Sequence, residues 1–196
     1  MKFTTTAIAA VIAAVFTSGA HAQSAASETQ RNVNQQQRIE QGLQSGSLTT
    51  REAARLEKGE ARIEKMQANA MQDGNLSAAE KARIQNAQNR ESQAIYNQKH
   101  DAQTGNPNSA SSQRMQADVQ RNINQQERIN QGVKSGALTT QETARLERGE
   151  ARIDRKQARA GADGHVGAHE QASIQRSENR ESRRIYRQKH DAQTRP

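Results

Sequence analysis

The chain has 196 residues, a formal net charge of +8 and no cysteine, which excludes disulfide bonds and thiol catalysis. Only 32% of the residues are hydrophobic and there is no tryptophan, so the composition is close to that of disordered chains. We therefore expect a small core and no deep pocket. The sequence also contains no nucleophile–base pair, Gly-rich phosphate loop or pair of catalytic acids, and we predict that the protein is not an enzyme.

The first 22 residues are typical of a signal peptide. Lys2 precedes an apolar run over residues 7–16, and residues 20–22 (AHA) match an A-x-A cleavage site. A membrane anchor is less favoured, because ten helical residues span ~15 Å and the hydrocarbon core is ~30 Å thick. We expect cleavage after Ala22 and a periplasmic or secreted protein. No later segment is long and apolar enough to span a bilayer.

The remaining sequence is dominated by an internal repeat. Residues 30–104 align with residues 120–194 at a constant offset of 90, without gaps and with about 64% identity. A gapless repeat of this kind indicates two copies of one structural unit. Residues 105–119 are predicted to be a linker and lead-in, because residues 105–113 (GNPNSASSQ) are rich in Gly, Asn, Pro and Ser.

Each repeat unit is predicted to contain three helices, which makes the fold all-α. In the first unit the expected helices cover about 30–44, 50–70 and 78–102, and no strand-like alternation is present. The expected core is small for 75 residues, so we predict pairing with the second unit or self-association. The predicted core of the first unit, with Tyr96 as an amphipathic cap, is Val33, Ile39, Leu43, Leu48, Leu56, Ile63, Leu76, Ile84 and Ile95.

Residues 71–80 (MQDGNLSAAE), repeated as 161–170 (GADGHVGAHE), have the spacing of the second half of an EF-hand calcium loop. In such loops a Gly, an apolar residue and a bidentate Glu take positions 6, 8 and 12. Two early ligand positions hold Met71 in the first copy and Arg159 in the second, so we expect at most weak calcium binding. The candidate ligands are Asn69, Asp73, Glu80, Asp163 and Glu170.

The same residues can also form capped helix corners that need no metal. Ser77-x-x-Glu80 and Thr49-x-x-Glu52 are capping boxes, in which the hydroxyl accepts from a backbone N–H and the Glu accepts from the cap N–H. Gly74 can supply a positive φ at the turn. We favour this interpretation, although it leaves Asp73 without a role.

The corners resemble EF-hand-type loops in which adjacent loops share one helix. Over both repeats, the chain resembles a group of uncharacterised exported proteobacterial proteins that are built of duplicated Arg/Gln-rich helical units with degenerate EF-hand-like loops. This resemblance implies an all-α, exported protein and brings no established activity.

The second repeat is the more basic one. Residues 30–104 carry 11 basic and 9 acidic side chains, whereas residues 120–194 carry 15 and 10. We predict that a basic stripe on the last helix binds an anionic envelope polymer or a protein partner, although interleaved Arg and Glu can also simply solvate helix faces. The absence of stacking aromatics disfavours specific nucleic-acid binding. The stripe consists of Arg180, Arg183, Arg184, Arg187 and Lys189.

Two further patterns have a chemical and a structural interpretation. His165 and His169 are four residues apart and could hold a transition metal, but His165 precedes the helix. His100, repeated as His190, is expected to end the third helix, because a cation is favourable near a helix C-terminus. Gly59, in the middle of the second helix and again in the second copy, indicates a close crossing, a kink or an inherited neutral residue.

Overall fold

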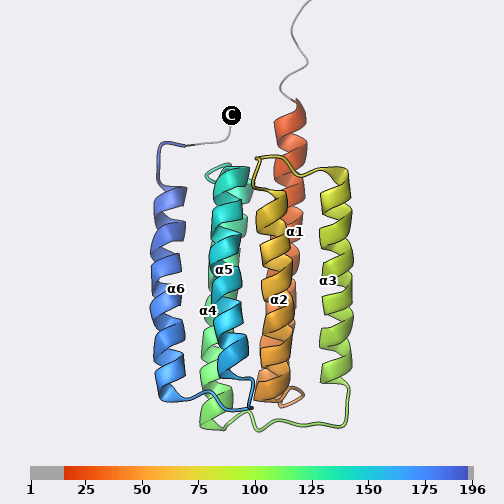
Figure 1. Cartoon of the computed structure of the whole chain (residues 1–196), viewed down its shortest axis with the longest axis vertical. Coiled ribbons are helices and arrows are strands. Elements are labelled where there is room, and N and C mark those ends of the chain that lie inside the picture. Colours follow the sequence, from red (N-terminus) through yellow and green to blue (C-terminus); the bar gives the residue numbers. More distant parts are fainter. Residues whose placement is uncertain (1–15, 194–196) are drawn as a thin grey trace, which may run out of the picture.

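The computed structural model describes residues 16–193, with side chains from residue 25 onward. No strand occurs in this range, which confirms the all-α class (Figure 1). None of the helices described is long and apolar enough to cross a membrane. The predicted signal peptide lies outside the residues with described side chains, as does the last residue of the second repeat. The helices are α1 (Phe16–Ser45), α2 (Thr50–Ala70), α3 (Ala78–Lys99), α4 (Ala110–Ser135), α5 (Thr140–Ala160) and α6 (Ala168–Lys189).

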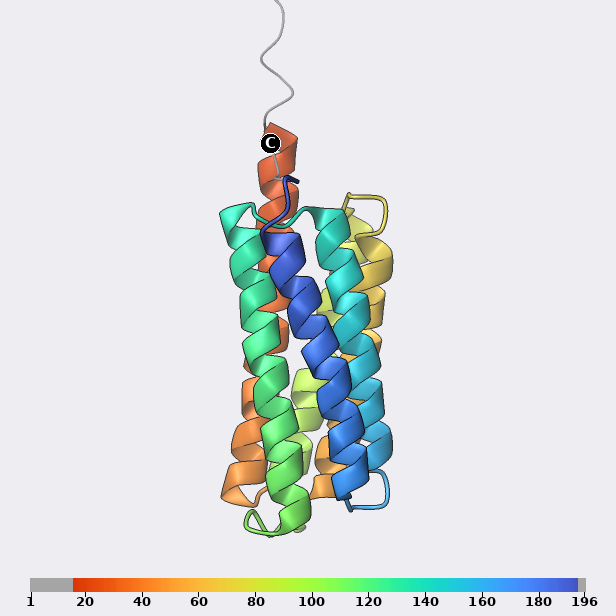
Figure 2. The same cartoon turned by 90° about the vertical axis from the view of Figure 1, so that its left-hand side faces the viewer.

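The six helices form one bundle in which helices that follow each other in the chain run antiparallel (Figure 1). The most extensive packing joins α2 to α5 and α1 to α4, so these four helices make the centre. Helix α3 flanks the centre on one side, and α6 packs over α4 and α5 on the other (Figure 2). Both central pairs are antiparallel, because Lys134 near the end of α4 donates to Gln30 of α1 and Arg51 near the start of α2 donates to the Asp163 carbonyl.

The hydrophobic core is shared between the two halves of the chain. Its largest cluster joins Val33 and Leu43 from α1 to Met115, Ile153 and Ile174 from the second half. All nine predicted core residues of the first repeat are buried. Tyr96 remains 52% exposed and lies outside the core. The packing of the halves against each other therefore supplies the apolar burial that either half lacks alone.

Two helices begin earlier than the sequence predicted. Helix α1 starts before residue 30, and α4 starts at Ala110, inside the predicted linker and lead-in of 105–119. Ser109 caps α4 by accepting from the Ser112 N–H, and Met115 and Val119 lie four residues apart on its buried face. An N-cap and two core contacts thus continue the helix through a segment whose composition favoured a linker.

The predicted capping boxes are present at the starts of α2, α3 and α5, where Thr49, Ser77 and Thr139 accept from backbone N–H groups. Gly74 and its counterpart Gly164 have φ of 87° and 91°, values that only glycine adopts readily. The capping residues and the turn glycines therefore have the roles that the sequence predicted.

The ends of α3 and α6 also follow the sequence. His100 and His190 are the C-cap residues of these helices. Each imidazole stacks on the tyrosine one turn earlier, with ring centroids 4.1 Å apart for Tyr96–His100 and 4.2 Å apart for Tyr186–His190. The helix-ending interpretation of these histidines is thus confirmed.

The mid-helix glycines allow a close approach from the flanking helices. A Cβ on Gly59 would overlap the carboxyl group of Glu91 from α3, and a Cβ on Gly149 would overlap that of Glu181 from α6. A side chain at either position would force this carboxyl group to move, because the carboxyl lies directly against the helix backbone. Through these contacts, α3 and α6 each place a carboxyl group against a central helix of the bundle.

Candidate polyanion-binding face

Acidic and basic side chains separate onto opposite faces of α2 and α5. No lysine or arginine is buried among residues 25–193, but twelve acidic side chains are. The basic residues of α2 and α5 all lie at least partly exposed on the outer side. The buried acids are Glu28, Glu52, Glu57, Glu60, Glu64, Asp118, Glu142, Glu147, Glu150, Asp154, Glu178 and Glu181.

Helical spacing produces this separation. Along α5 the arginines recur every three or four residues from Arg145 to Arg159, and such residues share one helix face. The acids Glu147, Glu150 and Asp154 follow the same spacing on the opposite face. Sequence reasoning treated these charges as interleaved and missed the arginine row of α5, although the two offset periods were visible in the sequence.

A groove between α5 and α6 is lined mainly by arginine. It has a volume of about 490 Å³ and no acidic residue lines it. Because guanidinium groups bind phosphate and carboxylate in a bidentate manner, the groove is suited to anions. Its lining residues are Arg145, Arg148, Arg152, Arg184, Arg187 and Gln188.

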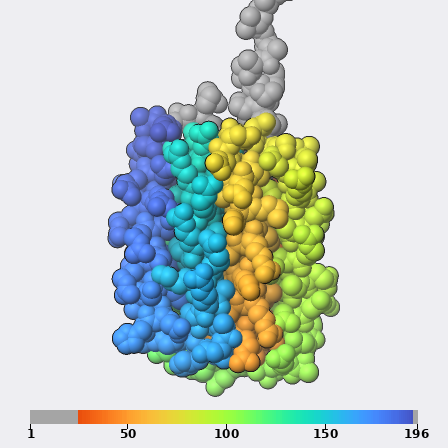
Figure 3. Space-filling model, viewed as in Figure 1, coloured from red at the N-terminus to blue at the C-terminus, as the bar shows by residue number. Residues whose placement is uncertain are grey.

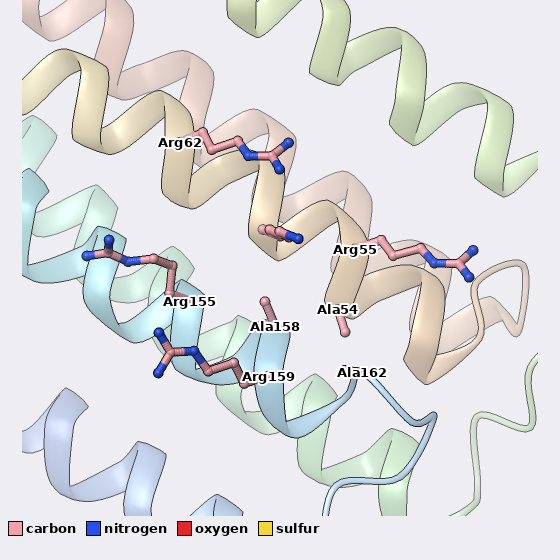
Figure 4. Close-up of a pocket in the computed structure, with 8 residues that line it drawn as sticks. Ala54, Arg55, Arg62, Arg155, Ala158, Arg159 and Ala162 are labelled. Atoms are coloured by element: carbon pink, nitrogen blue, oxygen red, sulfur yellow. The ribbon is translucent and has the colours of Figure 1, made fainter.

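A second groove runs between α2 and α5 and has a volume of about 480 Å³. Ala54, Ala158 and Ala162 lie between the two helices, and Figure 4 shows the arginine heads of α2 and α5 pointing away from each other on either side of these alanines. The two grooves lie on either side of α5, and Figure 3 shows α6, α5, α2 and α3 side by side on this surface. We call the following residues the cationic face: Arg55, Lys58, Arg62, Arg145, Arg148, Arg152, Arg155, Arg159, Arg184 and Arg187.

The predicted basic stripe of α6 divides in the structure. Arg184 and Arg187 line the α5–α6 groove, and Arg180 lines a smaller adjoining hollow. Arg184 also pairs with Glu181, with Nη1 and Oε2 3.0 Å apart. Arg183 is exposed but lines none of these grooves, and Lys189 lies at the far end of α6, where its side chain is close to Gly132.

The interior facing α2 and α5 is rich in carboxyl groups whose pKa values are raised. Burial raises the pKa of Glu91 and Asp154 to about 7 and the pKa of Asp118 and Glu147 to about 8. Because these pKa values lie at or above 7, much of the acidic charge is suppressed near neutral pH. The net charge of the molecule near neutral pH is therefore more positive than the formal value of +8.

The predicted calcium ligands do not converge. No group of three or more His, Asp or Glu within the described residues could hold a metal ion. Asp73 Oδ1 accepts from the Asn75 N–H at 2.9 Å, and Glu80 Oε2 accepts from the Ser77 N–H at 3.0 Å. The exposed Asn69 belongs to the last turn of α2.

The second corner uses its carboxylates in the same way. Asp163 Oδ1 accepts from the His165 N–H at 2.8 Å, and Glu170 Oε2 accepts from the Gly167 N–H at 2.9 Å. Asp73 and Asp163 thus gain the role that capping did not provide, since each closes its turn two residues on. Calcium binding stays a prediction.

His165 and His169 are both exposed at the start of α6. His165 lies in the turn before the helix and His169 in its first turn. They belong to no potential metal-binding group in the part of the chain that the structure describes. Transition-metal binding by this pair stays a prediction.

Comparisons with models of protein families, with curated proteins and with solved structures found no match to this chain.

Proposed function

We propose that the chain is an exported, non-enzymatic protein that binds anionic polymers of the cell envelope through its cationic face. The observation that carries this proposal is the separation of charge on α2 and α5, where the acids are buried and the bases are not. Interleaved charges that merely solvate a helix would leave both signs on the surface. The signal-like residues 1–22 support export.

The proposal includes an architecture of two copies of a three-helix unit with degenerate EF-hand-like corners, closed against each other through α1–α4 and α2–α5. Equivalent contacts support it. Arg38 donates to the carbonyl oxygen of Ser92, and Arg128, 90 residues later, donates to that of Ser182. In this arrangement both second helices face outward on the same side of the molecule, so their basic stripes lie side by side.

The shape of the face favours a linear polymer over a single small anion. Arg145 and Arg159 are fourteen residues apart on α5, which corresponds to ~21 Å along the helix axis. A chain with repeated phosphate or carboxylate groups can contact several of these arginines at once, whereas a single phosphate meets only one or two. The only Phe, Tyr or Trp residues among residues 25–193, Tyr96 and Tyr186, lie outside both grooves, so base-specific recognition is disfavoured.

The test uses polyphosphate as a linear polyanion and titrates it against the protein at several salt concentrations. Tight binding at low salt should weaken as salt rises, because bound counterions are released on association. Replacing Arg145, Arg148 and Arg187 by Gln should lower affinity strongly at 50 mM salt. It should also reduce the slope of log K against log salt by ~0.7 per lost phosphate contact.

A matched control comes from the other half of the chain. Arg55 and Lys58 stand 90 residues before Arg145 and Arg148, but α3 carries Asn97 where α6 carries Arg187. Replacing Arg55 and Lys58 by Gln should weaken binding less, because the groove beside α6 is left intact. The proposal would be contradicted by an affinity that does not change with salt concentration. It would also be contradicted by an unchanged affinity in the variant of Arg145, Arg148 and Arg187.

A further inference from the structure

The interior of the bundle contains more hydrogen-bond acceptors than donors to pair with them. Within the described residues, every buried side-chain polar atom that lacks a hydrogen-bond partner is an oxygen. Neither carboxyl oxygen of Glu60, Glu150 or Asp118 has a partner, and all three side chains are fully buried. An ionised carboxylate in such a place is strongly disfavoured, because it has lost its hydration and gained neither a donor nor a counter-ion.

The protein's own groups do not make up this shortage of donors. Buried amides such as Asn32 and Gln67 already donate to each other at 2.7 and 3.1 Å, and Gln36 already donates to Glu57. Lysine and arginine are absent from the interior of the described range. A proton on a carboxyl group removes its charge and adds an O–H donor. Protonation therefore removes the buried charge and also supplies a missing hydrogen-bond donor.

One carboxyl pair lies where the two halves of the chain meet. Glu64 of α2 and Asp154 of α5 occupy equivalent positions of the repeat, both are buried at the most extensive helix contact, and one carboxyl oxygen of each has no hydrogen-bond partner. Burial raises the pKa of Glu64 and the charge of Asp154 adds to this effect, so a proton on these carboxyls is favoured.

The titratable and charged groups around the interior carboxyls come from every helix. Acids predominate on the inner faces, and the cations approach from outside. The acids are Glu57 and Glu60 of α2, Glu91 of α3, Asp118 of α4, Glu147 and Glu150 of α5, and Glu178 and Glu181 of α6; the cations are Arg38 of α1, Arg62 of α2, Arg121 of α4, Arg152 and Arg155 of α5 and Arg184 of α6.

We propose that this interior is a proton-operated latch: the bundle closes with protons on its interior carboxyls and opens between α2 and α5 when those protons leave. Loss of the protons places two like charges on Glu64 and Asp154 across the contact. The neighbouring acids then add repulsion of the same sign. The α2–α5 groove of the cationic face is built across this contact, so it exists in the closed state only.

The expected pH dependence has a defined sign. Burial raises the pKa of Glu57, Glu60, Glu64 and Glu150 well above the ordinary value of 4.5. The folded chain therefore holds more protons than the unfolded chain from about pH 4.5 up to the raised pKa values of these groups. The stability from these groups is fully present below pH 4.5 and is lost as pH rises through their folded pKa values.

The test measures the thermal unfolding of the chain without residues 1–22 by circular dichroism between pH 5 and pH 9, after dialysis against a chelator. Tm should fall by at least about 10 °C over this range. Unfolding in urea at pH 6.5 in weak buffer should release several protons, and this measurement needs no variant. The double variant Glu64→Gln, Asp154→Asn should release fewer protons and lose part of the pH dependence.

The control is Glu127→Gln on the outer part of α4, which should reproduce the wild-type pH profile and proton release. A Tm that stays constant or rises with pH overturns the proposal, and so does the absence of proton release on unfolding. Calcium or manganese that stabilises the chain at pH 8, with the effect lost in the double variant, would also overturn it, because a metal ion would then be the counter-charge.

Discussion

Helices α3 and α6 occupy equivalent flanks of the bundle but differ on their outer surfaces. Their buried residues match, with Ile84 and Ile95 of α3 corresponding to Ile174 and Ile185 of α6. The half-buried and exposed positions differ, since Ala94 and Asn97 of α3 correspond to Arg184 and Arg187 of α6. Burial restricts the inner face of each helix, whereas a solvated position accepts almost any polar residue. The cationic groove beside α6 therefore arose on surface positions that packing leaves free.

The largest expected effect tests the shared inner face. Ile95→Ala and Ile185→Ala should each lower the free energy of unfolding by about 2–5 kcal/mol, because each removes a fully buried side chain and leaves a cavity. Chemical denaturation of both variants at pH 5 measures this. Losses that differ widely between the two variants would show that the two flanking helices are not packed equivalently.

The second prediction concerns the glycines beneath the flanking carboxyls. Gly59→Ala and Gly149→Ala should each destabilise the fold by about 1–3 kcal/mol, because the new methyl group overlaps Glu91 or Glu181. Ala is the better helix former by about 1 kcal/mol, so an open position would show the opposite sign. Denaturation of Gly149→Ala, with and without Glu181→Ala, measures the effect. The added Glu181→Ala change should recover much of the stability that Gly149→Ala loses.

The third prediction uses the different N-caps of the flanking helices. Ser77 caps α3 with its hydroxyl, whereas Gly167 at the start of α6 has no side-chain cap. Ser77→Ala should cost about 1 kcal/mol, and Gly167→Ser should gain a few tenths of a kcal/mol. Thermal melts compare the two variants. A gain at Gly167 as large as the loss at Ser77 would contradict this ranking.

The smallest expected effect is calcium binding at the first corner. We expect a dissociation constant no tighter than about 10⁻⁴–10⁻³ M, because Asp73 and Glu80 already accept backbone N–H groups. Calorimetry should show weak heat that disappears in Asp73→Ala. The second corner, with Arg159 at the equivalent of Asn69, should bind more weakly still. The absence of heat and of thermal stabilisation at millimolar calcium would end the hypothesis.

The sequence alone identified local structure well. The helix class, the capping boxes at Thr49 and Ser77, the positive φ of Gly74 and the core positions such as Ile39 depend on neighbours within a few residues or on helical periodicity. Such signals are visible without knowing what the helix packs against. The extension of α4 back to Ala110 was missed, because its stability comes from Met115 and Val119 packing on distant residues.

The tertiary structure decided which face of each helix is buried and against what. The sequence shows acids and bases interleaved along the helices, and such charges can simply solvate helix faces. Only the pairing of α2 with α5 places such acids together in a low-dielectric interior, where their charge is suppressed, and collects the arginines of α5 and α6 along one groove. Helical periodicity thus separated the charges along each helix. The packing of the halves determined that the acids became the interior and the bases became the binding face.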